Sequence, residues 1–290
     1  MTIDRPTVNL WQTVFDGAED NPNAIIEPDT LKFTNNDCSL YFETDVIVDL
    51  LKQGEHRKSD YMGLVSPTFR HKLAHYSWYA KDFSVDSLSI HCKHYQPNVC
   101  NLMGGKVQNP FKHGEVFHPG ILNLFSSLVS RIPGYADVDI DRRWTISPIW
   151  CNFFVADTAT WEDYSQTLLF PALDLVEQDE DLRNSLLQST TYGDNKMPQK
   201  LQDKYGVVSY PFLPFVFERL INLYLAVRPD IKYTCWGKKP QPDIPAGWAN
   251  DYDWFQDRVK FPPKQNPTRP PKALLAEHRR RIKQAKKLKN

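Results

Sequence analysis

The chain has 290 residues, 41% hydrophobic and 13% aromatic, which is enough to bury the core of one large domain. Its formal net charge is zero, and five scattered cysteines fit a reducing compartment rather than a disulfide framework. Neither G-x-G-x-x-G nor G-x-x-x-x-G-K-[ST] occurs, which argues against dinucleotide-binding dehydrogenases and P-loop enzymes. No apolar run of about 18 residues occurs, and Asp4 and Pro6 do not suit a secretion signal. We therefore expect a cytoplasmic protein without a transmembrane segment.

The first hundred residues alternate predicted strands with predicted helices. Apolar runs at 8–15, 23–28, 60–67 and 85–92 are typical of strands. Residues 43–53 place their apolar side chains on one helical stripe. This alternation indicates an α/β layer fold.

The next segments are predicted to continue the pattern. Residues 118–134 carry a continuous apolar stripe and form the clearest helix, with Pro119 in its first turn. Residues 144–157 are expected to be extended and to lead into a helix that starts at Thr160. Pro171 should kink that helix.

The composition changes towards the end of the chain. Residues 240–271 hold eight prolines, which predicts that 231–271 form an extended strap packed on the body, residues 1–230. Residues 272–290 hold eight Lys or Arg and one acid, and they form a basic tail that can be helical. Such a tail suits DNA or an anionic membrane as a partner.

Asp137 and Asp139 alternate within residues 135–144. On an extended segment their carboxylates would point the same way and could hold Mn²⁺ or Mg²⁺ beside a diphosphate leaving group. A solvated turn is the alternative, and metal-independent chemistry stays open.

Glu115 and His118 lie just before the clearest predicted helix. A carboxylate and an imidazole there are candidates for acid/base catalysis or for binding sugar hydroxyls. Capping of the helix is the structural alternative.

Residues 211–225 are strongly apolar but contain Glu218, Arg219 and Asn222. On a single helix of 100° per residue, these three share a sector roughly 100° wide. We predict that this sector either lines a cleft or faces water.

Six short motifs occur in an order and spacing that resemble a family of GT-A type glycosyltransferases encoded among bacterial and viral polysaccharide-synthesis genes. The matching residues run from about 40 to 225. They are Glu43; Tyr61, Gly63, Ser66, Phe69 and Lys72; Gly114, Glu115, His118, Pro119 and Gly120; Asn152 to Ala156; Thr190 and Tyr192; and Glu218 and Arg219.

The resemblance implies a Rossmann-like α/β/α domain that transfers a sugar, a hexose or a pentose, from a nucleotide-sugar donor to an acceptor hydroxyl. The acceptor could be a glycan, a lipid-linked glycan or a modified DNA base. We predict Glu218 as the catalytic base, with Glu115 as second choice. His118 is a further acid/base candidate. The predicted donor-binding residues are Ser66, Arg70, Asn152 and Arg219.

One motif departs from the family. Where relatives have D-V-Y-x-x-x-P at a strand end, this chain has SIHCKHYQP, so the metal site implied by the family is left open. The alternative function is a catalytically inactive binding module that docks on nucleic acid or membrane through residues 272–290.

Overall fold

A computed structural model describes most of the first 236 residues. The chain divides into two compact units, residues 1–250 and 251–290, and every described residue belongs to the first. The basic tail and nearly all of the predicted strap therefore lie outside the described residues. The described ranges are 5–15, 23–34, 39–76, 82–103, 109–141, 147–190, 202–203, 206 and 208–236.

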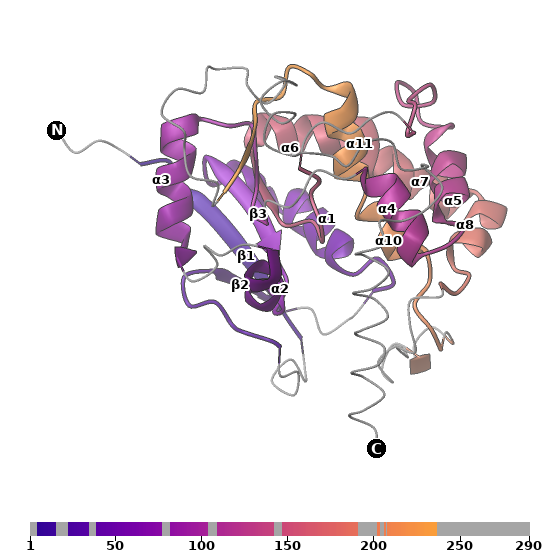
Figure 1. The fold of residues 1–290 in the computed structure, drawn as a ribbon, viewed down its shortest axis with the longest axis horizontal. Coiled ribbons are helices and arrows are strands. Elements are labelled where there is room, and N and C mark those ends of the chain that lie inside the picture. The colour runs from indigo at the N-terminus through magenta and orange to yellow at the C-terminus, as the bar shows by residue number, and fades with distance from the viewer. Residues whose placement is uncertain are drawn as a thin grey trace, which may run out of the picture. The chain divides into compact units, whose positions relative to one another are not determined.

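A mixed six-stranded sheet has the strand order β2-β1-β3-β5-β4-β6. Figure 1 labels three of these strands, β1, β2 and β3. Strand β1 is parallel to β2 and β3, while β5 runs antiparallel to its neighbours β3 and β4, and β4 is parallel to β6. In the central strand β3, Gly63 is required because a Cβ there would lie 2.2 Å from the Phe154 carbonyl oxygen. The strands are β1 Val8–Val14, β2 Leu31–Thr34, β3 Tyr61–Val65, β4 Val99–Asn101, β5 Phe154–Asp157 and β6 Tyr233–Cys235.

Helices cover both faces of the sheet. Met62 and Leu64 of β3 belong to one hydrophobic core, whereas Tyr61 and Val65 belong to a second. Because side chains alternate along a strand, the two cores lie on opposite faces. The first core includes residues of α1 Glu43–Lys52, α4 Pro110–Phe117, α5 Ile121–Val129, α6 Thr158–Tyr164, α7 Phe170–Gln178, α8 Glu180–Leu186, α10 Leu213–Phe217 and α11 Leu220–Val227. The second includes residues of α2 Phe69–Tyr76 and α3 Val85–Tyr95. The predicted α/β class is confirmed, and the layers are compatible with a Rossmann-like fold.

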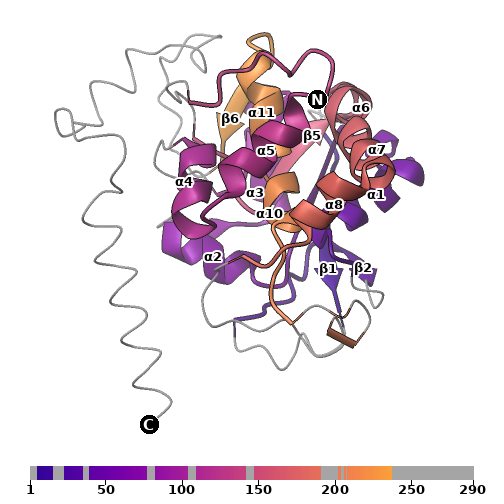
Figure 2. The same ribbon diagram turned by 90° about the vertical axis from the view of Figure 1, so that its right-hand side faces the viewer.

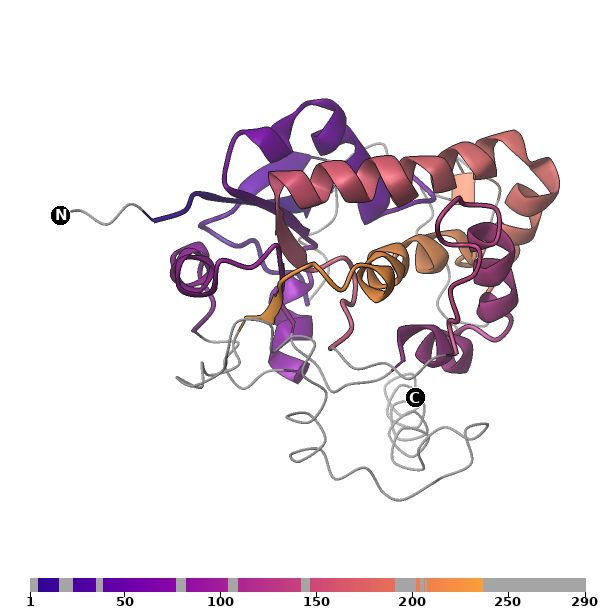
Figure 3. The ribbon, with the colours of Figure 1, turned by 90° about the horizontal axis from the view of Figure 1, so that it is seen from above.

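Helices α6 and α7 form one continuous run through a π-helical turn, Ser165–Leu169, as Figure 3 shows. The run begins at Thr158, two residues earlier than predicted, because the Asp157 side chain accepts the Thr160 N–H at 2.8 Å and caps it. This π turn ends two residues before Pro171, and the kink predicted at Pro171 stays a prediction. Figure 2 shows α6 and α7 lying beside α1.

Two predicted strands are wrong. Residues 85–92 lie in helix α3, where Leu88 and Cys92 are buried four residues apart and Ile90 is exposed. Ser84 and Ser87 form a capping box that starts this helix. Residues 23–28 form a loop in which Glu27 is buried.

The predicted helix at 118–134 is shorter. Helix α5 begins at Ile121, and Gly120, with φ of 99°, separates it from helix α4, which was not predicted.

The single amphipathic helix predicted at 211–225 is also wrong. Helix α10 ends at Phe217 and α11 begins at Leu220. Between them the Arg219 N–H bonds the Val216 carbonyl at 3.1 Å, an i to i−3 contact that tightens the backbone. Arg219 and Asn222 are both buried, so these two polar residues do not face water.

Candidate functional site

The carboxyl ends of β1, β3, β4 and β6 lie at one edge of the sheet, because these strands run in the same direction. The antiparallel strand β5 begins at that edge, so the segment before it lies there too. In open α/β sheets, ligands bind outside the carboxyl ends of the strands. We call this region, at the carboxyl ends of the strands and distinct from the edge strands of the sheet, the carboxyl edge.

Four residues from distant parts of the chain gather at the carboxyl edge. Lys72 of α2 donates from Nζ to Cys151 Sγ at 3.3 Å, and the Cys151 N–H donates to Glu218 Oε1 at 2.7 Å. Glu43, the first residue of α1, is close enough for its charge to act on Lys72. All four are half-buried. We refer to Glu43, Lys72, Cys151 and Glu218 as the edge cluster.

The cluster fixes the protonation of its members. Burial by itself lowers the pKa of Lys72, but the Cys151 sulfur and the two carboxylates outweigh burial, and the pKa of Lys72 rises above its ordinary value. Burial raises the pKa of the Cys151 thiol to about 12. Burial also raises the pKa of the Glu43 carboxyl, although Lys72 opposes this shift. At neutral pH the cluster therefore holds an ammonium ion and a protonated thiol, so Cys151 is not a thiolate nucleophile.

The backbone that carries Cys151 is held in a conformation that is unusual outside glycine. Cys151 and Asn152 have φ of 57° and 54°, and each left-handed residue costs roughly 1–2 kcal/mol. Asn222 holds the preceding turn, because its side chain accepts the Ile149 N–H at 2.8 Å and donates to the Ile149 carbonyl at 2.9 Å. Asn101 donates to the Pro148 carbonyl at 2.9 Å. Buried amides thus fix the segment that presents Cys151 to Lys72.

Two of the predicted donor-binding residues lie at the carboxyl edge. Ser66 directly follows β3, is buried, and its hydroxyl lies 3.0 Å from that of Thr68. Asn152 is buried beside Cys151. A role in donor binding stays a prediction for both.

The two predicted arginines are engaged within the protein. Arg70 pairs with the buried Glu27 through two bonds, from Nε at 2.8 Å and from Nη2 at 2.6 Å. Arg219 is only 4% exposed and donates to the carbonyls of Pro110 and Phe215. Its guanidinium lies against Gly114, where a Cβ would come within 2.6 Å of Nε. Arg219 therefore joins α4 to α10.

Glu115 caps a helix. Its two carboxylate oxygens accept the N–H groups of Gly120 and Leu122 at 2.8 and 3.1 Å, at the start of α5. The anionic group favoured at this helix N-terminus is thus a side chain of the protein itself.

His118 is buried and stacks on Phe215 at 3.9 Å between ring centroids. Burial, and then Arg219, lower the pKa of His118 to about 3 and that of His113 to about 4. Both imidazoles are neutral at pH 7.

Asp137 and Asp139 do not form the paired site expected of an extended segment. Both side chains are exposed in a region of turns, and Asp139 Oδ1 accepts the Asp141 N–H at 2.9 Å. Within the ranges that the structure describes, no three His, Cys, Asp or Glu side chains are grouped so that they could hold a metal ion.

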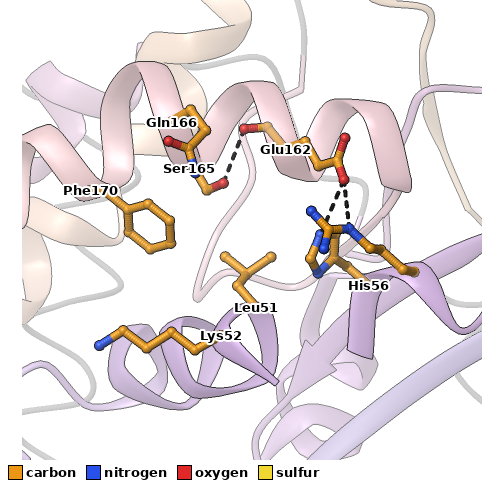
Figure 4. Close-up of a pocket in the computed structure, with 8 residues that line it drawn as sticks. Leu51, Lys52, His56, Glu162, Ser165, Gln166 and Phe170 are labelled. Carbon is orange, nitrogen blue, oxygen red and sulfur yellow. Dashed lines mark hydrogen bonds and ion pairs between the residues drawn. The ribbon is translucent and has the colours of Figure 1, made fainter. Parts of the chain in front are cut away.

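A hollow of about 400 Å³ lies at the opposite end of α1 from Glu43 (Figure 4). Ten residues of α1 separate the two places by about 14 Å. In the hollow, Glu162 accepts from Arg57 Nε at 2.8 Å and lies 3.7 Å from the buried His56. The lining residues are Leu51, Lys52, His56, Arg57, Glu162, Ser165, Gln166 and Phe170.

The predicted site residues do not include Glu43, Lys72 or Cys151. Glu43 and Lys72 occur only among the motif residues of the resemblance, and Cys151 is predicted only as an ordinary free thiol. The signal for Lys72 was its position in the first turn of the helix that follows β3, and no sequence signal pointed to the left-handed turn at Cys151.

Among the helices described, none is both long and apolar enough to cross a membrane. Comparisons of the chain with protein-family models, with curated proteins and with solved structures give no match.

Proposed function

We propose that the protein is a glycosyltransferase that moves a sugar from a nucleotide-sugar donor to an acceptor hydroxyl, with the edge cluster at its active site. The observation that carries the proposal is that Lys72 and Glu218 both contact Cys151 and that Glu43 lies near enough to act on them. Glu43, Lys72 and Glu218 come from three separate motifs of the resemblance, yet they gather at the sheet edge where α/β folds bind ligands.

Glu218 is the proposed base. One of its oxygens is fixed by the Cys151 N–H, and within the described part of the chain no hydrogen bond occupies the other. A carboxylate held in this way can accept the proton of an attacking hydroxyl. Glu115 is a poorer choice because both of its oxygens already accept backbone N–H groups.

Lys72 supplies a positive charge near the base. Its ammonium group stays protonated and attracts a nearby carboxylate. The family metal is not assigned to Asp137 and Asp139, since their exposed turns do not fit it.

The proposal is tested by incubating the full chain with a panel of nucleotide sugars, with and without Mn²⁺, and measuring donor hydrolysis and thermal stabilisation. At least one donor should raise the melting temperature and be hydrolysed slowly. The absence of both responses for every donor would overturn the proposal.

A further inference from the structure

The edge cluster mixes acidic and basic groups. The carboxyl groups of Glu43 and Glu218 act on one ammonium group, Lys72, and Cys151, which contacts both Lys72 and Glu218, is a neutral thiol. Since burial raises the pKa of Glu43, the cluster sets one ammonium group against at least one carboxylate and has no net positive charge at neutral pH. All of its members are half-buried, so a ligand can reach them while part of the water is excluded.

This charge pattern is poorly suited to a phosphate group. A diphosphate brings at least two negative charges, and in this partly buried site a single ammonium group, already offset by a carboxylate, would have to balance them. The guanidinium groups that would suit phosphate better are engaged elsewhere, Arg70 with Glu27 and Arg219 with backbone carbonyls.

The same pattern suits uncharged hydroxyl groups. A hydroxyl both donates and accepts, so neighbouring hydroxyls can donate to a carboxylate and accept from an ammonium group. Lys72 has three N–H donors, of which one is directed at Cys151 Sγ. A neutral ligand also leaves the charge balance of the site unchanged.

We propose that Glu43, Lys72 and Glu218 bind the hydroxyl groups of a sugar and not the diphosphate of the donor. This inference rests on the proposed function and names the part of the substrate that the edge cluster recognises. The hydroxyls could belong to the donor sugar or to an acceptor sugar, and the experiment separates these sources.

The test compares the dissociation constants of UDP and GDP with those of the matching nucleotide sugars, for the wild type, Lys72→Met and Glu43→Gln. If the cluster binds donor hydroxyls, both variants weaken nucleotide-sugar binding at least fivefold while binding of the free nucleoside diphosphate stays within twofold. If only an acceptor sugar binds there, donor affinity is unchanged, and both variants lose binding of glucose, galactose or mannose to the diphosphate complex, measured by saturation-transfer NMR.

Loss of diphosphate binding overturns the inference. A diphosphate at the cluster predicts that Lys72→Met weakens UDP or GDP binding at least tenfold. Unchanged binding of every ligand in both variants overturns it as well. If Lys72→Met fails to fold, the double variant Glu43→Gln/Lys72→Gln replaces it and is expected to lose sugar binding alone.

Matched substitutions at the hollow of Figure 4 serve as controls. Lys52→Met and Glu162→Gln make the same chemical changes at the other end of α1 and should leave all affinities within twofold. Wild-type protein that binds no nucleotide or nucleotide sugar refutes the proposed function. In that case, monosaccharide binding lost in both cluster variants would still support hydroxyl recognition, and no monosaccharide binding by the wild type would refute it.

Discussion

The two ends of helix α1 carry similar residue types in different surroundings. At Glu43, the edge cluster is half-buried and its backbone is held by the buried side chains of Asn101 and Asn222. At the other end, the side chains of Arg57 and Glu162 are 65% and 45% exposed and form a direct ion pair at the surface. An exposed ion pair is screened by water, whereas partly buried charges strongly affect protonation and ligand binding. Burial and backbone support, rather than the presence of charges, therefore distinguish the candidate site.

The largest effect on stability is expected when the support of the edge cluster is removed. Asn222→Leu leaves the N–H and carbonyl groups of Ile149 buried without their partner, so the free energy of unfolding should fall by about 3 kcal/mol. Urea denaturation measures this loss. The control is Gln166→Leu at the exposed hollow, which should change stability by less than about 0.5 kcal/mol. Equal losses of unfolding free energy in Asn222→Leu and Gln166→Leu would remove the distinction between the two ends of α1.

Acid should destabilise the protein through two histidines near Arg219. The pKa values of His113 and His118 are lowered in the folded state, so the unfolded chain takes up protons first as the pH falls below about 6.5. Above that pH the two histidines do not lower the free energy of unfolding. Below it, the free energy of unfolding declines towards pH 4, by up to about 1.4 kcal/mol per pH unit for each histidine. Urea denaturation between pH 7 and 5 tests this, and His118→Leu should roughly halve the slope of the unfolding free energy against pH. An equal slope in His118→Leu and the wild type would contradict the assignment of acid sensitivity to His118.

A smaller loss is expected at the start of α5. Glu115→Ala removes the acceptor for the N–H groups of Gly120 and Leu122 and should cost about 1–2 kcal/mol of stability. Glu115→Gln keeps one carbonyl acceptor and should cost less. Donor turnover per folded molecule should be unchanged in Glu115→Gln, and a loss of turnover there would restore Glu115 as a catalytic candidate.

The smallest effect is expected at the hollow. Arg57→Ala breaks an exposed ion pair, so turnover should stay within twofold and the melting temperature should barely change. Calorimetry and the donor assay measure both. A marked loss of turnover would show that the two ends of α1 act together.

Regular patterns made part of the fold predictable. Residues 43–53 and 60–67 carried clear helical and buried-strand patterns, and α1 and β3 occur there. Residues 85–92 were mistaken for a strand because Leu88, Ile90 and Cys92 also fit an alternating pattern. The capping serine at Ser84 was the local signal that favoured a helix.

The site was only partly predictable because it depends on contacts between distant segments. Glu218 could be singled out as a charge in an apolar segment, but its contact with Cys151 spans 67 residues. Arg219 donates to the carbonyl of Pro110, which lies 109 residues away, and Glu115 can cap α5 only because the helix breaks at Gly120. No local pattern reveals such tertiary partners.

The most direct test of the edge cluster as a catalytic site is to measure turnover of Glu218→Gln beside the matched control Glu162→Gln. With a donor identified from the panel, Glu218→Gln should lower turnover by about 10²- to 10⁴-fold because it removes the base, while donor affinity changes little. Glu162→Gln should retain full turnover. Full turnover in Glu218→Gln would contradict the assignment of the edge cluster as the active site.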